Sequence, residues 1–294
     1  MKRFFISSLF FLIGILVINA FIYQIVNKLL YKPYSIELNK VEKYDSFLMA
    51  DSHGKSVNQA DLDKISIFNL SYNSDSYVDI YIKLNYLINN NVKIKNLYLT
   101  ADEHTLSPYR ETGNNNSRSV FFTDYTSYNE LYGKQYATYF YETIFIKYFA
   151  LINTNNSKLV RKYLFSENET PYDEKSFKDL TVKERKRKAE SRVKLQFVGN
   201  THSSKMNKYL EKIFMLCREN NISVYGIKFP VSKAYLTSLS NKSYNIDSIF
   251  RENKIRVFDL KKVFIENDDY FENQDHLNKK GSQQFSKILK ERIK

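Results

Sequence analysis

The longest hydrophobic run in the chain lies at its N-terminus, where residues 4–26 contain no charged side chain. These 23 residues are enough for an α-helix that crosses a bilayer core of about 30 Å. Lys2 and Arg3 precede the run, and such charges favour the cytoplasmic side, although lysines beyond the run weaken that bias. We therefore predict a cytoplasmic stub and transmembrane anchor in residues 1–31, with the remaining chain outside the cytoplasm at the cell membrane. A cleaved signal peptide is the alternative.

After residue 45, short apolar stretches alternate with longer segments of helical periodicity. The apolar stretches have strand length and end in polar turn residues, whereas the longer segments carry apolar side chains three and four positions apart. The expected strands are residues 47–50, 65–70, 94–100, 222–229 and 256–260, and the main expected helices are residues 77–88, 205–220 and 282–293. This alternation predicts a three-layer α/β fold with a parallel sheet and helices on both faces.

Residues 107–202 interrupt the alternation. They comprise an aromatic-rich helical pattern at residues 128–152, a polar, turn-like stretch at 153–175 and a charged helix at 180–193. We interpret the region as a largely helical insertion that covers the ligand crevice, and residues 32–45 as a linker. The α/β domain then extends over residues 46–294.

Composition narrows the classes of partner. The chain has 294 residues, 43% of them hydrophobic, and a formal net charge of +13, which allows a packed core and favours anionic partners such as lipid headgroups or acidic glycans. Nucleic acid is not an expected partner, because no zinc-finger spacing, recognition helix or RNA-binding aromatic motif occurs. The single cysteine, Cys217, excludes an intramolecular disulfide and a cysteine-based metal cluster, and its apolar helical surroundings indicate a core position.

Two stretches far apart in the sequence carry the candidate chemistry. The strand at residues 47–50 stops at Asp51-Ser52-His53-Gly54, so Ser52 is expected at the carboxyl end of a buried strand, where open α/β sheets bind ligands. Near the C-terminus, His276 precedes the last helix. A serine needs a base to take its proton, and a neutral imidazole can do so near pH 7. The sequence thus suggests a serine nucleophile and a histidine base, whereas a plain N-capped helix at each place is the alternative.

These stretches resemble the SGNH (GDSL-like) hydrolase superfamily. The similarity lies in residues 50–53 (Ala-Asp-Ser-His) and in residues 273–278 (Asn-Gln-Asp-His-Leu-Asn) with Gly281, and the region of resemblance covers residues 42–294. The chain is most similar to membrane-anchored members linked to cell-surface polysaccharide acylation. The resemblance implies a flavodoxin-like sheet, catalysis by Ser52 and His276, and no cofactor.

The group that orients the histidine departs from the superfamily pattern. The usual aspartate, three residues before the histidine, is replaced here by Asn273, and Asp275 is directly adjacent to His276. Neighbouring side chains on an extended loop tend to diverge. Three possibilities stay open: Asp275 acts through an unusual turn, Asn273 orients the imidazole as an amide, or the site is a dyad.

Oxyanion and substrate contacts are expected from the ends of the first three strands. The backbone N–H groups of Ser52 and Ser71 and the side-chain amide of Asn73 are candidate oxyanion donors. The remaining candidates for pocket-lining or substrate-binding residues are Asp51, His53, Asp102 and His104. Residues 102–104 offer three metal-binding side chains in a row, which seldom converge on one ion even if His53 joins them, so we predict no metal site.

The expected function is an extracytoplasmic serine esterase or O-acyltransferase that acts on cell-envelope polysaccharide through an acyl-serine intermediate, as the resemblance implies. Its partners would be an acylated or acyl-accepting glycan, the membrane through the N-terminal helix, and as a further candidate a membrane acyl-donor protein. The alternatives are a noncatalytic binding or assembly protein of the envelope with the same fold, and a structural protein that uses its +13 charge at a membrane surface.

Overall fold

The computed structural model describes residues 1–165, 176–199, 201–240 and 242–293, and the chain divides into two compact units. We call Glu37–Asn116 with Lys175–Lys294 the α/β unit, and Met1–Ile36 with Ser117–Glu174 the helical unit. The insertion was expected over residues 107–202, but its two ends, residues 107–116 and 175–202, group with the α/β unit. The segment between them groups with the N-terminal helix.

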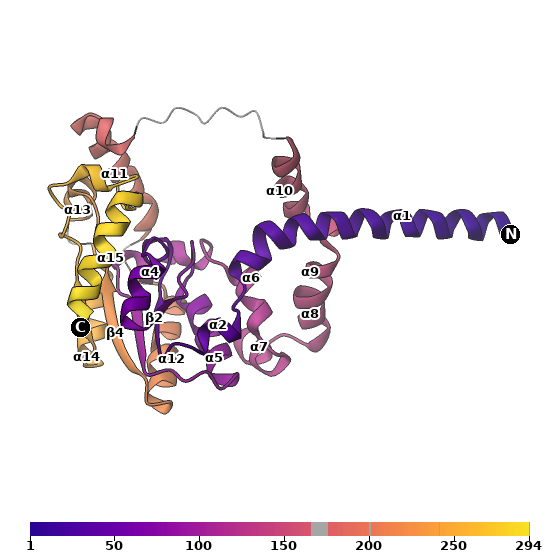
Figure 1. The fold of residues 1–294 in the computed structure, drawn as a ribbon, viewed down its shortest axis with the longest axis horizontal. Helices are drawn as coiled ribbons and strands as arrows, with labels where there is room; N and C mark the ends of the chain where they lie inside the picture. Colours follow the sequence, from indigo (N-terminus) through magenta and orange to yellow (C-terminus); the bar gives the residue numbers. More distant parts are fainter. Residues whose placement is uncertain (166–175, 200, 241, 294) are drawn as a thin grey trace. The chain divides into compact units, whose positions relative to one another are not determined.

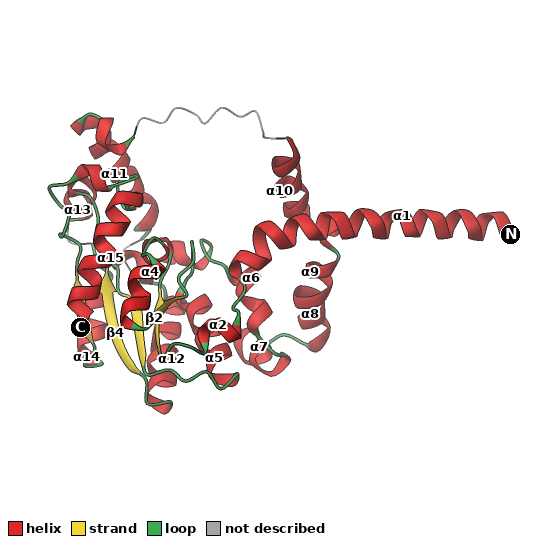
Figure 2. Ribbon diagram, viewed as in Figure 1, coloured by secondary structure: helices red, strands yellow, loops and turns green. Residues whose placement is uncertain are grey.

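A five-stranded parallel sheet forms the centre of the α/β unit (Figure 2). Its strands are β1 (Ser46–Met49), β2 (Ile67–Asn69), β3 (Asn96–Thr100), β4 (Ser223–Lys228) and β5 (Arg256–Asp259), in the order β2-β1-β3-β4-β5. Each strand falls within or beside a predicted one, so the parallel α/β architecture is confirmed. The strand order reverses between β1 and β3, which is where ligands bind in doubly wound sheets.

Helices of the α/β unit cover both faces of this sheet (Figure 1). They are α2 (Leu38–Val41), α3 (Ser52–Lys55), α4 (Gln59–Leu62), α5 (Tyr77–Asn89), α11 (Val182–Gln196), α12 (Ser204–Glu219), α13 (Lys233–Leu239), α14 (Ile246–Glu252) and α15 (Lys279–Ile293), with 3-10 turns at Asp63–Ile65, Glu103–Leu106, Pro108–Glu111, Phe177–Asp179 and Asp268–Tyr270. Helix α14 was not predicted, because its apolar residues are too few to establish a period.

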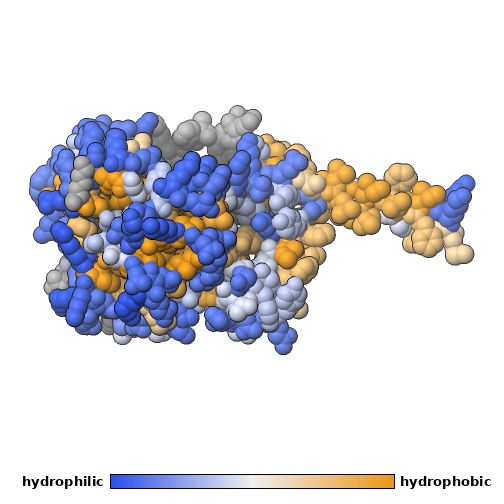
Figure 3. Space-filling model, turned by 60° about the horizontal axis from the view of Figure 1, so that its bottom comes forward, coloured by the Kyte–Doolittle hydropathy of each residue, from blue (hydrophilic) through white to orange (hydrophobic). Residues whose placement is uncertain are grey.

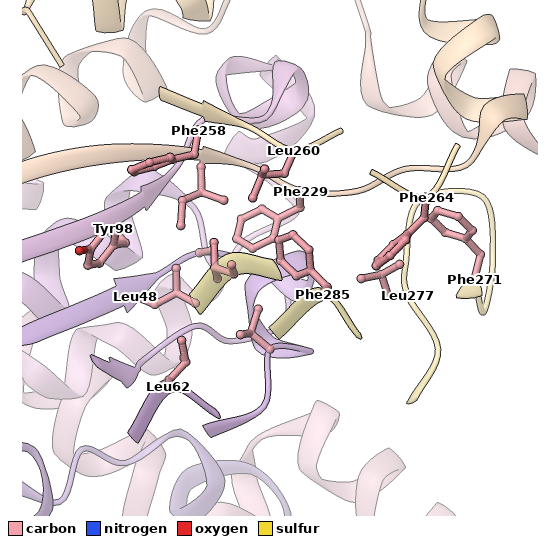
Figure 4. Close-up of a cluster of buried hydrophobic side chains, with 14 of the residues drawn as sticks. Leu48, Leu62, Tyr98, Phe229, Phe258, Leu260, Phe264, Phe271, Leu277 and Phe285 are labelled. Carbon is pink, nitrogen blue, oxygen red and sulfur yellow. The ribbon is translucent and has the colours of Figure 1, made fainter. Parts of the chain in front are cut away.

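Alternate side chains of the strands point to different helices. Leu48 of β1 belongs to a buried cluster with Leu62 of α4 and Phe285 of α15, together with Phe229 just after β4 (Figure 4). On the opposite face, α14 approaches β4 so closely that a Cβ added at Gly226 would lie 2.9 Å from the ring of Phe250. The sheet is therefore buried on both faces, as its short, almost uniformly apolar strands indicate.

The helical unit is built around the N-terminal helix α1 (Lys2–Val26), which continues through a π-helical turn at Asn27–Tyr31. Its other elements are a 3-10 turn at Lys32–Tyr34, α6 (Asn116–Ser119), a 3-10 turn at Val120–Phe122, α7 (Tyr125–Tyr132), α8 (Tyr136–Phe140), a π-helical turn at Tyr141–Phe145, α9 (Ile146–Tyr148), a 3-10 turn at Ala150–Ile152 and α10 (Thr154–Phe165). The prediction of a turn-like stretch at 153–175 was wrong for residues 154–165, and residues 166–175 lie outside the described residues. The predicted linker also contains helical turns.

Helix α1 is long and apolar enough to cross a membrane. Figure 3 shows it hydrophobic along its length apart from its N-terminal end. Its C-terminal turns are packed: Ile25 and Val26 are buried with Tyr31, Ala150 and Val160.

Candidate active site

A tight turn at the carboxyl end of β1 positions Ser52. Asp51 caps the one-turn helix α3, since its Oδ1 accepts a hydrogen bond from the His53 N–H at 3.0 Å. Gly54 allows this helix to approach the segments that follow β1 and β2: an added Cβ would lie 2.5 Å from the Cβ of Ala50 and 2.7 Å from the Oγ of Ser71. The sequence Asp-Ser-His-Gly thus holds the serine at the reversal point of the sheet.

A closed loop before α15 presents His276 to this serine. Phe271 and Leu277 form an antiparallel bridge and are both buried in the core, so the loop between them is fixed at its base (Figure 4). The Oγ of Ser52 lies 2.7 Å from the Nε2 of His276. Two residues that are 224 positions apart in the sequence are therefore in hydrogen-bond contact.

Asn273 fixes the orientation of the imidazole. Its Oδ1 lies 3.0 Å from the Nδ1 of His276 and also accepts the backbone N–H groups of Asp275 at 3.1 Å and His276 at 3.0 Å. An atom that receives two backbone N–H groups is the amide oxygen, so Nδ1 carries the proton that it donates to Asn273. The Nε2 lone pair is then directed at the hydroxyl of Ser52.

Asp275 adds a negative charge behind the imidazole. Its Oδ1 lies 3.3 Å from the His276 Nδ1, and its Oδ2 accepts hydrogen bonds from the Arg192 Nε at 2.7 Å and the Gln196 Nε2 at 3.1 Å. Burial alone would raise the pKa of this carboxyl, but His276, His53 and Arg192 together hold it well below its usual value. We expected neighbouring side chains to diverge; the closed loop instead brings both Asn273 and Asp275 to Nδ1, the amide being closer.

A second layer of histidine–carboxylate pairs lies beneath the serine. The His53 Nδ1 lies 2.8 Å from the Asp102 Oδ2, and the His104 Nε2 lies 3.0 Å from the Asp51 Oδ2. The His53 ring also packs edge-on against His276, with ring centroids 5.0 Å apart. All four residues of these pairs, which we expected to line the pocket or bind substrate, are buried, and none of them lines the cavity next to Ser52. Their observed contacts support the turn.

The cavity next to Ser52 has a volume of about 390 Å³. It is lined by Ser52, Lys55, Ser56, Asn73, Glu272, Asn273, His276 and Leu277. Within the described residues, neither the Ser52 N–H nor the side-chain amide of Asn73 has a hydrogen-bond partner. The expected third donor, the Ser71 N–H, already donates to the Asn69 Oδ1 at 3.0 Å.

Buried charges hold the loop that carries Asn73. The Lys83 Nζ donates to the Asp75 Oδ2 at 2.5 Å and to the Leu70 carbonyl at 2.9 Å. Asn115 donates to the Asn73 carbonyl at 2.6 Å and to the Asp75 Oδ1 at 2.7 Å. The position of Asn73 relative to Ser52 therefore depends on an ion pair that the sequence analysis did not identify.

Metal-binding side chains do come together beneath the turn, but they are already paired. One potential ligand atom from each of Asp51, His53 and His104 lies within 4.8 Å of the others. The guanidinium of Arg110 also lies 3.8 Å from the Asp51 Oδ2. A cation there would have to displace a hydrogen bond of each histidine and face a positive charge, so this donor set does not favour a metal.

Arg192 and Gln196 were not identified from the sequence because Arg192 lies in a helix predicted only as charged, and Gln196 lies beyond the predicted end of that helix at residue 193. A basic and an amide side chain four positions apart on one helix face form the only signal.

No model of a known protein family and no curated protein sequence matches this chain.

Replacing Asn273 gives a test of its orienting role. We expect Asn273→Ala to lower kcat for an activated acetyl ester by roughly 10²-fold, because the imidazole loses the acceptor that fixes its tautomer. Asn273→Asp keeps an oxygen acceptor and should retain more activity than the alanine variant, as measured by steady-state hydrolysis. Equal activity of both variants and the unaltered protein would show that Asp275 alone orients His276.

His53 makes stability depend on pH. Burial alone would lower the pKa of His53, but the carboxylates of Asp51, Asp102 and Asp275 raise it well above 6.5. A histidine whose pKa is higher in the folded state than in the unfolded state stabilises the fold. Its contribution to the free energy of unfolding is complete below the unfolded-state pKa of about 6.5 and is lost as the pH rises through the folded-state pKa. We therefore expect the Tm of the full chain to fall as the pH rises above about 6.5, and the fall to be smaller in His53→Gln. Parallel Tm profiles of the two proteins would contradict this role.

Proposed function

We propose that this protein is a membrane-anchored serine esterase or O-acyltransferase that forms an acyl-serine intermediate at Ser52. The observation that carries the proposal is the Ser52–His276–Asn273 relay, with 2.7 Å from Oγ to Nε2 and 3.0 Å from Nδ1 to the Asn273 Oδ1. The relay opens into a cavity at the carboxyl ends of parallel strands. The strand order 2-1-3-4-5 is also the flavodoxin-like order that the SGNH resemblance implies.

The mechanism follows from these positions. The Oγ of Ser52 attacks the ester carbonyl while its proton passes to the Nε2 of His276. Charge developing on the carbonyl oxygen is stabilised by the Ser52 N–H and the Asn73 amide, which have no hydrogen-bond partner among the described residues. The imidazolium is held by Asn273 and stabilised electrostatically by the Asp275 carboxylate, 3.3 Å from Nδ1. His276 then returns the proton to the leaving alcohol.

The second half-reaction decides between the two activities. Water that loses its proton to His276 releases the acid, which is hydrolysis; a sugar hydroxyl in the same position takes the acyl group, which is transfer. The acyl group leaves the Ser52 oxygen in either case, and Ser52 regains its proton from His276. Both activities use the same residues of this chain.

The character of the cavity favours a short acyl group on a polar carrier. Of its eight lining residues only Leu277 is apolar, so a long hydrocarbon chain has no apolar wall to contact. Lys55, Ser56 and Glu272 instead offer hydrogen bonds to hydroxyl groups. Together with α1 as a single-pass anchor whose N-terminus stays inside, this supports a cell-envelope polysaccharide outside the cytoplasm as the carrier, with a membrane acyl-donor protein as a candidate partner.

A noncatalytic binding or assembly protein is the second candidate. One observation favours it: the group closest to the His276 Nδ1 is an amide, which cannot stabilise an imidazolium by full charge. In cells, Ser52→Ala separates the two candidates, because a binding protein keeps its role in the envelope and an enzyme loses it.

Turnover of an activated acetyl ester by the full chain in detergent tests the proposal. We expect the ester to be hydrolysed much faster than in buffer alone. If the protein is a transferase, adding an envelope glycan should reduce the release of acetate and produce acetylated glycan. No turnover with or without the glycan would favour the noncatalytic candidate.

A further inference from the structure

A polar residue inside the apolar helix α1 is bound to another segment of the helical unit. The side chain of Asn19 donates to the Tyr148 carbonyl at 2.8 Å and accepts the Leu151 N–H at 3.2 Å. The rings of Tyr23 and Tyr148 lie 5.5 Å apart. Both hydrogen-bonding functions of Asn19 are thus satisfied by backbone groups of the turn between α9 and α10, as a polar side chain in lipid requires.

The position of Asn19 gives the depth of this turn in a bilayer. Hydrocarbon about 30 Å thick takes about 20 helical residues at 1.5 Å each. Counted from Phe4, next to the charged Lys2 and Arg3, the far boundary then falls near Tyr23. Asn19 lies one turn inside that boundary, so the turn bound to it must lie at the level of the lipid.

The segment that follows α7 has the surface that such a position requires. Several large apolar and aromatic side chains in this short stretch of sequence are exposed. The side chains of Ile152 and Tyr136 are 50% and 58% exposed. Others are Phe140, Tyr141, Ile144 and Leu151. The adjoining helix α10 is basic, with Lys158, Arg161 and Lys162 and no acidic residue. Aromatic and aliphatic side chains beside basic ones are typical of segments that lie in the membrane interface.

We propose that residues 136–165 form an interfacial element that inserts its apolar side chains into the outer lipid leaflet beside α1, with the cations of α10 among the headgroups. This inference rests on the membrane crossing by α1 that the proposed function also uses, but not on catalysis. The occupant of the exposed surface is lipid and not a second protein, because the segment is continuous with α1 at the depth of hydrocarbon.

Depth-dependent fluorescence quenching can test the inference, because the chain contains no tryptophan. Single-tryptophan variants of the full chain are placed in phosphatidylcholine–phosphatidylglycerol vesicles with or without bromine on the acyl chains. Ile152→Trp reports the element, Leu12→Trp reports α1, and Met215→Trp, on the exposed surface of α12 in the α/β unit, is the aqueous control. Ile144→Trp repeats the measurement at a second position if Ile152→Trp fails to fold.

We expect bromolipid to quench Ile152→Trp several-fold more than Met215→Trp and to a similar extent as Leu12→Trp. Quenching of Leu12→Trp alone would overturn the interfacial element and leave the anchor intact. Blue-shifted but unquenched emission from Ile152→Trp would overturn it in favour of a protein covering the segment. No quenching of Leu12→Trp or Ile152→Trp would overturn both this inference and the membrane crossing.

Discussion

Replacing Ser52 by alanine should lower kcat for an activated acetyl ester by about 10⁴–10⁶-fold, because the substitution removes the proposed nucleophile. His276→Ala should cause a loss of similar size, since the hydroxyl without its base at 2.7 Å is a weak nucleophile. The double variant should be no worse than either single one, because the two groups act as a unit. Steady-state hydrolysis by full-length variants measures all three.

A matched serine provides the control for this series. Ser248 lies on α14, and its Oγ accepts a hydrogen bond from the Arg251 Nη2 at 2.9 Å, apart from the cavity. Ser248→Ala should keep full activity. Additive losses in the Ser52→Ala, His276→Ala double variant would indicate that the two residues act separately, against the relay.

The second large effect is expected on stability, from Lys83→Met. The Lys83–Asp75 ion pair is almost completely buried, so removing the cation takes away the charge that offsets the buried Asp75 carboxylate. We expect the free energy of unfolding to fall by about 3–5 kcal/mol. Because burial raises the pKa of Asp75 to about 6 even beside Lys83, the carboxyl should become protonated in the variant, which limits the loss.

Lys95→Met is the matched control for Lys83→Met. Lys95 pairs with Asp45 at the same 2.5 Å distance, but its side chain is 58% exposed, so solvent screens the pair and its loss should be worth less than about 1 kcal/mol. Urea unfolding followed by circular dichroism compares the two variants with the unaltered chain. Equal destabilisation by both would show that burial of the Lys83 pair has no energetic consequence.

The sheet could be predicted because its strands and the helices between them are encoded in short, local patterns of apolar and polar residues. The strand at residues 47–50 and the helix at 77–88 are each identified by the length and periodicity of their apolar positions and by the polar residues at their ends. Both were predicted to within a few residues of their observed bounds. Helix α10 was missed because its polar and basic positions resemble a loop until Val160 is seen packed against α1. The apolar residues of α10 pack against a helix that is distant in the sequence, and a local sequence pattern does not reveal such a contact.

Ser52 and His276 of the candidate site could be predicted from the sequence, but the contacts of the groups around them could not. Ser52 and His276 carry strong local signals, a serine after a buried strand and a histidine before a helix. The choice between Asn273 and Asp275 depends on the closure of the loop between Phe271 and Leu277, a long-range packing property. The paired state of His53 likewise depends on Asp102, 49 positions away, so sequence reasoning placed it on the cavity wall instead of beneath the turn.

The most direct test of the account is the covalent intermediate itself. The full chain is incubated with an activated acetyl ester, quenched in acid before turnover is complete, and examined by intact mass, with Ser52→Ala in parallel. The account predicts one acetyl group on the unaltered protein, mapped to the peptide that contains Ser52, and none on the variant. An unmodified wild-type chain, or an adduct that persists in Ser52→Ala, would contradict it.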